Sequence, residues 1–196
     1  MTKQISNTKR ITTSAILIAT ALVLDFISRI IPGMPQGGSI TLASLVPILV
    51  ISYCYGWKWG VFSALVFGIL KAILSRNFAW MPEPTFWSFT TVALLDYIVA
   101  FGVIGLADLF RKPFKNESFG YAFSCVVVMF LRFLCHFASG IIIWYPFAEA
   151  AGFDNRWLFS AIYNGSYMLP EAIISSVVVV ILMRYVKKGF NENERR

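Results

Sequence analysis

Long apolar stretches separated by short polar segments form the main pattern along the chain. An α-helix needs about 20 mainly apolar residues to cross a bilayer, and proline, glycine or clustered charges end each stretch here. The pattern predicts six transmembrane helices, at about residues 11–31, 40–55, 60–75, 87–110, 119–147 and 157–185. The second is short for a span, and Pro47 interrupts it. We therefore expect an all-α integral membrane protein in which residues 1–196 form a single membrane domain.

Composition supports this class. Hydrophobic residues make up 58% of the 196 positions and charged residues 14%, whereas soluble domains carry about 25% charged residues. Most of the chain therefore cannot face water. Six spans with short loops leave no room for a separate soluble catalytic domain.

The formal net charge of +7 would fit nucleic-acid binding if the basic residues were clustered on one surface. Instead, Lys and Arg concentrate in alternate loops, as the positive-inside rule describes. The opposite loops contain Arg76 and Arg156, accompanied by Glu83, Glu149 and Asp154. We therefore expect both termini in the cytoplasm and no nucleic-acid partner. The basic residues assigned to the cytoplasmic side are Lys3, Lys9, Arg10, Lys58, Arg111, Lys112, Lys115, Arg184, Lys187 and Lys188.

Signals for metal binding and catalysis are weak. The three cysteines, Cys54, Cys125 and Cys135, lie in apolar runs without CxxC spacing, and the chain has one histidine. They are typical of small buried hydrophobic residues, so we expect no metal site and no cofactor. The chain also lacks GxSxG, HExxH and Walker A motifs, and we do not expect an enzyme.

Polar residues inside a membrane are costly and usually functional, and the predicted fifth helix has several. Arg132, His136, Gly140 and Trp144 recur at a spacing of four, which places them close to one helix face. This stripe combines a cation, an imidazole, a gap at the glycine and an aromatic plate, as a binding site would require. The alternative is a packing face at which Gly140 admits a neighbouring helix.

Neighbouring helices add polar groups at similar depth. The predicted fourth helix has Asp96 and Tyr97, and the sixth has Tyr163, Asn164 and Tyr167. A carboxylate among aromatic rings suits a small, flat, cationic or amine-bearing ligand. For Asp96 alone, a structural ion pair is the alternative.

Two charges lie deeper in the predicted helices. Arg132 and Glu171 come out near the same level at a rise of about 1.5 Å per residue, so we expect them to form a buried pair beneath the pocket. The alternative places Glu171 against a polar cavity or a partner subunit.

On the first helix, Ala15 and Ala19, with Ala21 nearby, have the small-xxx-small spacing of close helix contacts. That spacing fits either internal packing or a partner-docking surface.

Four segments together resemble a known family. MPQGGS (34–39), LLDYIVAF (94–101), RFLCHFASG (132–140) and YNGSYMLP (163–170) are similar to the signature segments of thiamine-specific substrate-binding subunits. These are the S components of energy-coupling factor (ECF) vitamin transporters in the plasma membrane of Gram-positive bacteria. The segments occur in the expected order, and the resemblance extends over nearly the whole chain.

The resemblance implies a six-helix subunit with an outward-facing pocket between helices four to six, capped by extracellular loops. It implies docking, through Ala15 and Ala19, onto a transmembrane coupling subunit that works with two ABC-type ATPases. The pyrimidine ring of thiamine would stack on Trp144, and Asp96 would face the thiazolium charge. The ligand contacts implied by the resemblance are Asp96, Tyr97, His136, Gly140, Trp144 and Asn164.

The chain departs from the family pattern at several positions. Some members have glutamate at Asp96, lysine at Arg132 and tyrosine at Phe159. Some have a tryptophan in the first outer loop, where this chain has Gly37 and Gly38. A hypothesis is that aromatic residues of the loop before the fourth helix replace it: Trp80, Phe86 and Trp87.

Two other functions remain open at this point. One is an S component for another amine-bearing vitamin or precursor, such as the hydroxymethylpyrimidine half of thiamine. The other is a small intramembrane enzyme that uses His136 and Asp96 as acid and base.

Overall fold

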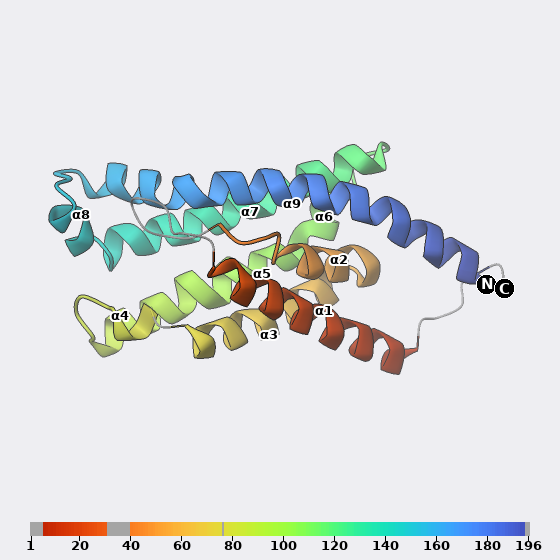
Figure 1. Ribbon diagram of the computed structural model, residues 1–196, viewed down its shortest axis with the longest axis horizontal. Coiled ribbons are helices and arrows are strands. Elements are labelled where there is room, and N and C mark those ends of the chain that lie inside the picture. Colours follow the sequence, from red (N-terminus) through yellow and green to blue (C-terminus); the bar gives the residue numbers. More distant parts are fainter. Residues whose placement is uncertain (1–5, 31–39, 76, 195–196) are drawn as a thin grey trace.

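The structure, a computed structural model, describes residues 6–30, 40–75 and 77–194, with side chains as far as Val186. Helices are the only regular secondary structure in these ranges, and the long ones run along the long axis of the molecule (Figure 1). In chain order the elements are α1 (Asn7–Ser28), α2 (Val46–Tyr55), α3 (Trp57–Leu74), η1 (Asn77–Ala79), α4 (Phe86–Val92), η2 (Ala93–Val99), α5 (Ala100–Gly102), η3 (Val103–Leu106), α6 (Ala107–Arg111), α7 (Glu117–Ile142), α8 (Pro146–Ala150) and α9 (Arg156–Glu194).

Five stretches in the described part of the chain are long and apolar enough to cross a membrane: α1, α3, the continuous helix Phe86–Arg111, α7, and residues Arg156–Val186 of α9. The sixth apolar helix, α2, has ten residues. These findings confirm the prediction of an all-α membrane protein.

The two ends of the bundle differ in charge, as the sequence predicts. The start of α1 and the end of α9 lie at one end, and α8 and the start of α4 lie at the other (Figure 1). The basic residues Lys9, Arg10, Arg111 and Lys112 belong to helix ends on the α1-start side, which is therefore the cytoplasmic end by the positive-inside rule. Lys3, Arg76 and the side chains of Lys187 and Lys188 lie outside the described part. We refer to the opposite end as the outer end.

The second helix begins later than predicted, at Val46 rather than at residue 40. Pro47 does not interrupt it but lies in its first turn, where a missing N–H breaks no intrahelical hydrogen bond. The preceding segment bends, and Ala43 adopts a positive φ of 54°. Eight of the ten α2 residues are buried, so the surrounding protein, not the bilayer, sets the length of this helix.

Other helix ends also differ from the predictions. The fifth helix was expected to reach residue 147, but α7 ends at Ile142 and the chain turns into α8 at Pro146. Proline disfavours a continued helix because it lacks the N–H that would bond to the carbonyl four residues earlier, here that of Ile142, and its ring clashes with that carbonyl. Conversely, α1 starts at Asn7 and α3 at Trp57, and α9 continues to Glu194 with Pro170 inside it.

The fourth span, Phe86–Arg111, is continuous but irregular. It starts as α4, widens into the π-helical segment η2, and tightens into the 3-10 segment η3 before α6. Asp96 and Tyr97 are the buried residues of η2. π-helical turns are rare and often occur at functional sites.

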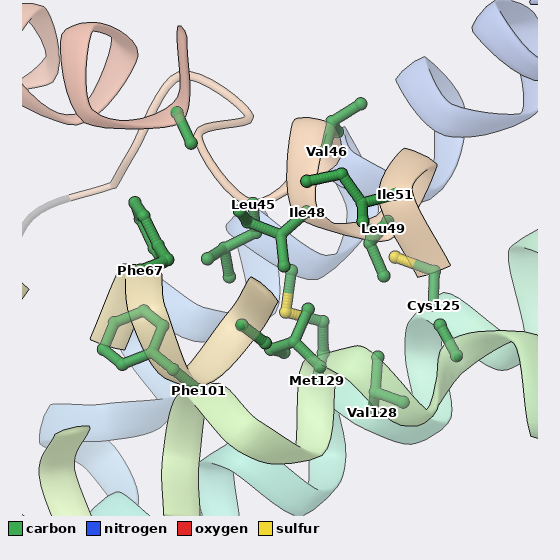
Figure 2. Packing of buried hydrophobic residues seen from close by; sticks show 14 of the residues in the cluster. Leu45, Val46, Ile48, Leu49, Ile51, Phe67, Phe101, Cys125, Val128 and Met129 are labelled. Atoms are coloured by element: carbon green, nitrogen blue, oxygen red, sulfur yellow. The ribbon is translucent and has the colours of Figure 1, made fainter. Parts of the chain in front are cut away.

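The apolar core is centred on α2. Leu45, Ile48 and Leu49 belong to one buried cluster with Phe67 of α3 and Met129 of α7 (Figure 2). Where lipid surrounds a bundle, helices associate mainly through such van der Waals contacts and through small residues that allow close approach. Gly60 of α3 and Gly105 of η3 allow such a close approach, because a Cβ on either would overlap the backbone or side chains of the facing helix.

We predict that Gly105→Ala lowers the thermal midpoint of the protein in detergent. The added methyl would overlap the backbone of Gly60 and Val61, which cannot move as a side chain can. Overpacking of this kind costs about 1–3 kcal/mol. Gly165→Ala on α9 is the control, because an added Cβ there would have no described atom within 4 Å apart from its chain neighbours and the adjacent backbone of its own helix. Equal losses in the two variants would contradict the close-approach explanation.

Candidate functional site

A cavity of about 600 Å³ lies towards the outer end of the bundle. We call it the outer cavity. Its walls come from η2, α7, α8 and α9, and Trp80 contributes from the loop before α4. The lining residues are Asn77, Trp80, Asp96, His136, Gly140, Trp144, Phe147, Ala150, Ala151, Phe159, Ser160, Tyr163, Asn164 and Tyr167.

The carboxylate of Asp96 contacts three other side chains. Ser139 Oγ–H donates to Asp96 Oδ2 at 2.8 Å, and the Trp144 indole N–H donates to the same oxygen at 3.2 Å. His136 Nδ1 lies 3.0 Å from Asp96 Oδ1. One side chain on η2 therefore contacts three side chains of α7 or its C-terminal end, and it sets the orientation of the Trp144 ring.

Two polar atoms of this cluster have unused hydrogen-bonding capacity. The contact between His136 Nδ1 and Asp96 Oδ1 does not count as a hydrogen bond, so Asp96 Oδ1 is buried without a hydrogen-bond partner among the described residues. The other ring nitrogen, His136 Nε2, is also buried without such a partner. Buried polar groups usually have such partners. A ligand that donates a hydrogen bond or carries a positive charge would satisfy the carboxylate at this position.

Gly140 and Asn164 line the wall between α7 and α9. A Cβ at Gly140 would overlap Ser160 Oγ, so the glycine permits the close approach of the two helices while also facing the cavity. The Asn164 amide N–H₂ donates to Ser160 O at 3.0 Å and to His136 O at 3.3 Å. Tyr167 donates to Asn164 Oδ1 at 2.9 Å. The amide is thus held in one orientation, with one further lone pair on Oδ1 to offer.

The aromatic walls include one residue of the loop that the sequence singled out. Trp80 lines the outer cavity although it is 70% exposed, as expected for a residue at an entrance. Phe86 and Trp87 are 89% and 70% exposed and do not line it. Of the three aromatics proposed to replace a missing lid tryptophan, only Trp80 is suitably placed. The MPQGGS segment, including Gly37 and Gly38, lies outside the described residues.

Tyr97 does not line the outer cavity, in contrast to the other five predicted ligand contacts. Its hydroxyl donates to Ser75 Oγ at 2.5 Å, and its ring stacks on Phe78 with centroids 5.5 Å apart. Tyr97 lines a second cavity of about 450 Å³, the inner cavity. The two cavities share five lining residues, namely Asn77, Asp96, His136, Tyr163 and Tyr167.

The predicted pairing of the two deep charges is confirmed. Arg132 donates to Glu171 Oε2 at 2.9 Å, and both side chains are buried. Thr41 donates to the other Glu171 oxygen, and the Arg132 guanidinium also lies 5.2 Å from the Phe101 ring centroid. The predicted stripe is therefore distributed over both cavities: Gly140 and Trp144 line the outer cavity, Arg132 lines the inner one, and His136 lines both.

Sequence reasoning missed several residues that line these cavities or hold their lining residues, among them Ser139, which donates to Asp96. Ser139 lies three residues after His136, so it shares a helix face that a search at a spacing of four passes over. Asp25 and Lys71 form a buried ion pair between α1 and α3. Each is a charge inside a predicted span, and that signal could have identified them.

The two alanines of α1 are exposed. The buried residues of this helix are Ser14, Ala21, Asp25 and Ser28, whereas Ala15 and Ala19 are on the solvent- or lipid-accessible side. They do not contribute to the interior of this chain.

We predict non-additive losses of stability for the buried pair. Arg132→Met or Glu171→Gln alone should each destabilise the protein by about 3–5 kcal/mol, because each leaves an uncompensated buried charge. The double variant should recover part of that loss, which a double-mutant cycle on thermal unfolding in detergent would measure. Arg184→Met is the control at an exposed arginine, with an expected change within about 0.5 kcal/mol. Additive losses would contradict the pairing.

Comparison with known proteins places the chain in a family. The family model described as "Thiamine transporter protein (Thia_YuaJ)" matches residues 11–191. The chain is 33% identical over 177 residues to the thiamine transporter ThiT of Bacillus subtilis (strain 168), covering 86% of each protein. It is 28% identical over 188 residues to ThiT of Lacticaseibacillus paracasei, covering 90% of this chain and 88% of that protein.

The fold also has a solved counterpart. The structure of ThiT from Listeria monocytogenes superposes with a TM-score of 0.72 at 23% identity, covering 91% of this chain and 95% of that one. Both curated relatives are transporters, so the interpretation of His136 and Asp96 as the acid and base of an enzyme is set aside. The match over residues 11–191, together with the curated relatives, shows that this chain belongs to the thiamine transporter family, a family of transport proteins and not of enzymes.

Proposed function

We propose that this chain is the high-affinity thiamine-binding subunit of an ECF-type vitamin importer. It captures thiamine in the outer cavity and delivers it together with a coupling subunit and two ABC-type ATPases. The observation that carries the proposal is the buried Asp96 carboxylate, which faces an aromatic-walled cavity and has one oxygen that accepts no hydrogen bond from the described residues. Family membership names the ligand that this chemistry would recognise.

The chemistry of thiamine matches the outer cavity. Thiamine has two flat rings, an aminopyrimidine and a thiazolium with a fixed positive charge. Trp144, Phe159 and Tyr163 provide aromatic faces, which attract cations and stack on flat rings. Asp96 supplies the opposite charge in a region of low dielectric, where such contacts are strong. A volume of about 600 Å³ lies within the usual range of small-molecule sites.

The remaining predicted contacts have complementary roles in this proposal. Asn164 Oδ1 accepts from the amino group of the pyrimidine, and His136 Nε2 contacts a polar group of the ligand. Tyr97 lines the inner cavity and lies next to Asp96 in the same π-helical segment, so its proposed role is to support the turn that carries Asp96.

The second candidate ligand is hydroxymethylpyrimidine, which corresponds to the pyrimidine half of thiamine. It carries an amine and a flat ring but no permanent charge, and so makes less use of a buried carboxylate. The position of Asp96 therefore favours thiamine.

The proposed docking surface lies on α1. Ala15 and Ala19 are exposed with small side chains, and small residues let a second helix approach closely. We propose that the coupling subunit contacts this surface in the plasma membrane of a Gram-positive bacterium.

The proposal is tested by titrating the purified protein in detergent with thiamine and, separately, with hydroxymethylpyrimidine. Trp144 and Trp80 line the outer cavity, so their fluorescence should change on binding. We expect saturation by thiamine at or below micromolar concentration, without added metal or nucleotide. Binding of the pyrimidine alone, or of neither compound, would contradict the assignment.

We predict that Asp96→Asn weakens the binding of thiamine more than that of an analogue with a neutral thiazole ring. Removing one member of a desolvated charge pair costs about 2–5 kcal/mol. Calorimetry on both ligands would measure the difference. Asp108→Asn is the matched control, since Asp108 is also buried but pairs with Arg111 at the cytoplasmic end of the same helix. Equal losses for the charged and neutral ligands would show that Asp96 is not the counter-ion.

We predict that Ala15→Trp or Ala19→Trp leaves thiamine binding intact but abolishes uptake when the chain is co-expressed with its coupling subunit and ATPases. Bulk on this face should prevent docking, while the outer cavity is formed by other helices. Ile173→Trp on α9 is the control, because it is also exposed but lies on another helix. Loss of thiamine binding in Ala15→Trp or Ala19→Trp would show instead that this face of α1 is needed for the structure of the binding site.

A further inference from the structure

The inner cavity differs chemically from the outer one. Ionisable side chains from four helices or their ends line it: Asp25 of α1, Arg29 directly after α1, Lys71 of α3, Arg132 of α7 and Glu171 of α9. Hydroxyl groups of Thr41, Ser44, Ser75 and Tyr97 also line it, together with apolar side chains such as Leu45, Phe67 and Phe101. Charges at such positions are costly in a membrane, so their arrangement constrains what can enter.

Each cation of this cavity is near a carboxylate. Lys71 Nζ bonds to Asp25 Oδ1, and Arg29 lies 3.6 Å from Asp25 Oδ2. Arg132 bonds to Glu171 at 2.9 Å. With Asp96 included, the described lining residues comprise three carboxylates and three cations. The wall is therefore formally neutral when His136 is neutral.

We infer that the inner cavity receives the uncharged polar tail of the ligand, and that Asp25 and Glu171 make the site select the free alcohol over its phosphate esters. This inference rests on the proposed function, because the ligand is taken to be thiamine, whose thiazolium ring bears a hydroxyethyl group.

The position of the tail follows from the two linings. The flat rings match the aromatic outer cavity, and Asp96 and His136 belong to both walls. A thiazolium beside Asp96 can thus extend its hydroxyethyl group into the inner cavity. There Arg132 Nε is buried and has no hydrogen-bond partner among the described residues, on a side chain that is 9% exposed. A ligand hydroxyl can accept from this N–H.

The phosphate group of a thiamine ester would find no free cation in the inner cavity. Phosphorylation adds a charge of about −1.5 to −2, and strong phosphate sites use cations that are free to donate to it. In this cavity Lys71 is already paired with Asp25, and Arg132 is already paired with Glu171. An entering phosphate would either lie against these carboxylates or break their pairs, and a broken pair leaves an uncompensated buried carboxylate. Removal of one carboxylate should relieve both penalties.

The experiment compares three ligands by calorimetry on the purified protein: thiamine, thiamine monophosphate and the neutral acetate ester of thiamine. We expect the monophosphate to bind the wild type at least about tenfold more weakly than the acetate ester, a difference that reports charge and not size. Similar dissociation constants for the two esters would overturn the inference.

Variants then assign the effect to residues. Asp25→Asn frees Lys71 and should narrow the preference for thiamine over its monophosphate by about tenfold. The double variant Asp25→Asn/Lys71→Gln restores a neutral wall and should restore the wild-type preference. Asp108→Asn, at a buried carboxylate outside both cavities, should leave the preference unchanged. Glu171→Gln should narrow the preference for thiamine over its monophosphate in the same way, because it frees Arg132. If Glu171→Gln proves too unstable to measure, the Asp25 variants alone test the inference.

The outcomes separate this inference from the proposed function. Equal binding of thiamine and its monophosphate by the wild type would overturn the inference and leave thiamine binding intact. An unchanged preference in Asp25→Asn would also overturn it. Absence of thiamine binding would instead overturn the proposed function.

Discussion

The cost of placing a charge inside a bundle surrounded by lipid is the constraint on which this arrangement of helices depends. Asp25 joins α1 to α3 through Lys71, and Arg132 joins α7 to α9 through Glu171. Asp96 joins η2 to α7 through hydrogen bonds from Ser139 and Trp144. These contacts are directional, unlike the van der Waals packing around α2, so they fix which faces of the helices meet. The cavities lie where these contacts occur.

Asp96 has a structural and a chemical role at once. Its Oδ2 accepts hydrogen bonds from Ser139 and from the Trp144 indole, the second of which orients the ring, and its Oδ1 faces His136 and the cavities. A carboxylate that is already oriented loses little freedom when a cation arrives, which is the advantage of preorganisation in binding. The side chain that shapes the aromatic wall thereby also presents the charge to the ligand.

Much of the fold follows from the sequence because bilayer thickness limits the length of a span. The Arg132–Glu171 pair was predictable for the same reason, since rise per residue converts position into depth. The spacing of four likewise predicted that His136, Gly140 and Trp144 share one cavity. Tyr97 was harder, because a π-helical turn changes the direction of successive side chains. The selection of Trp80 over Phe86 and Trp87 depends on the path of a loop, which periodicity does not describe.

The wide and tight turns of the helix Phe86–Arg111 also set its rotational phase. A π-helical turn rotates the chain less per residue than an α-helix, and a 3-10 turn rotates it more, so η2 and η3 act in opposite directions. Asp96 and Asp108 are both buried, and Ser52 accepts from Asp108 N–H and donates to Gly105 O. If the same seven residues of η2 formed a regular α-helix, each would add about 100° and the chain after them would be rotated relative to its present direction. Gly105 and Asp108 would then lose the orientation in which they meet α3 and Ser52. The wide turn near the ligand site thus determines whether the cytoplasmic half of the same helix fits its neighbours.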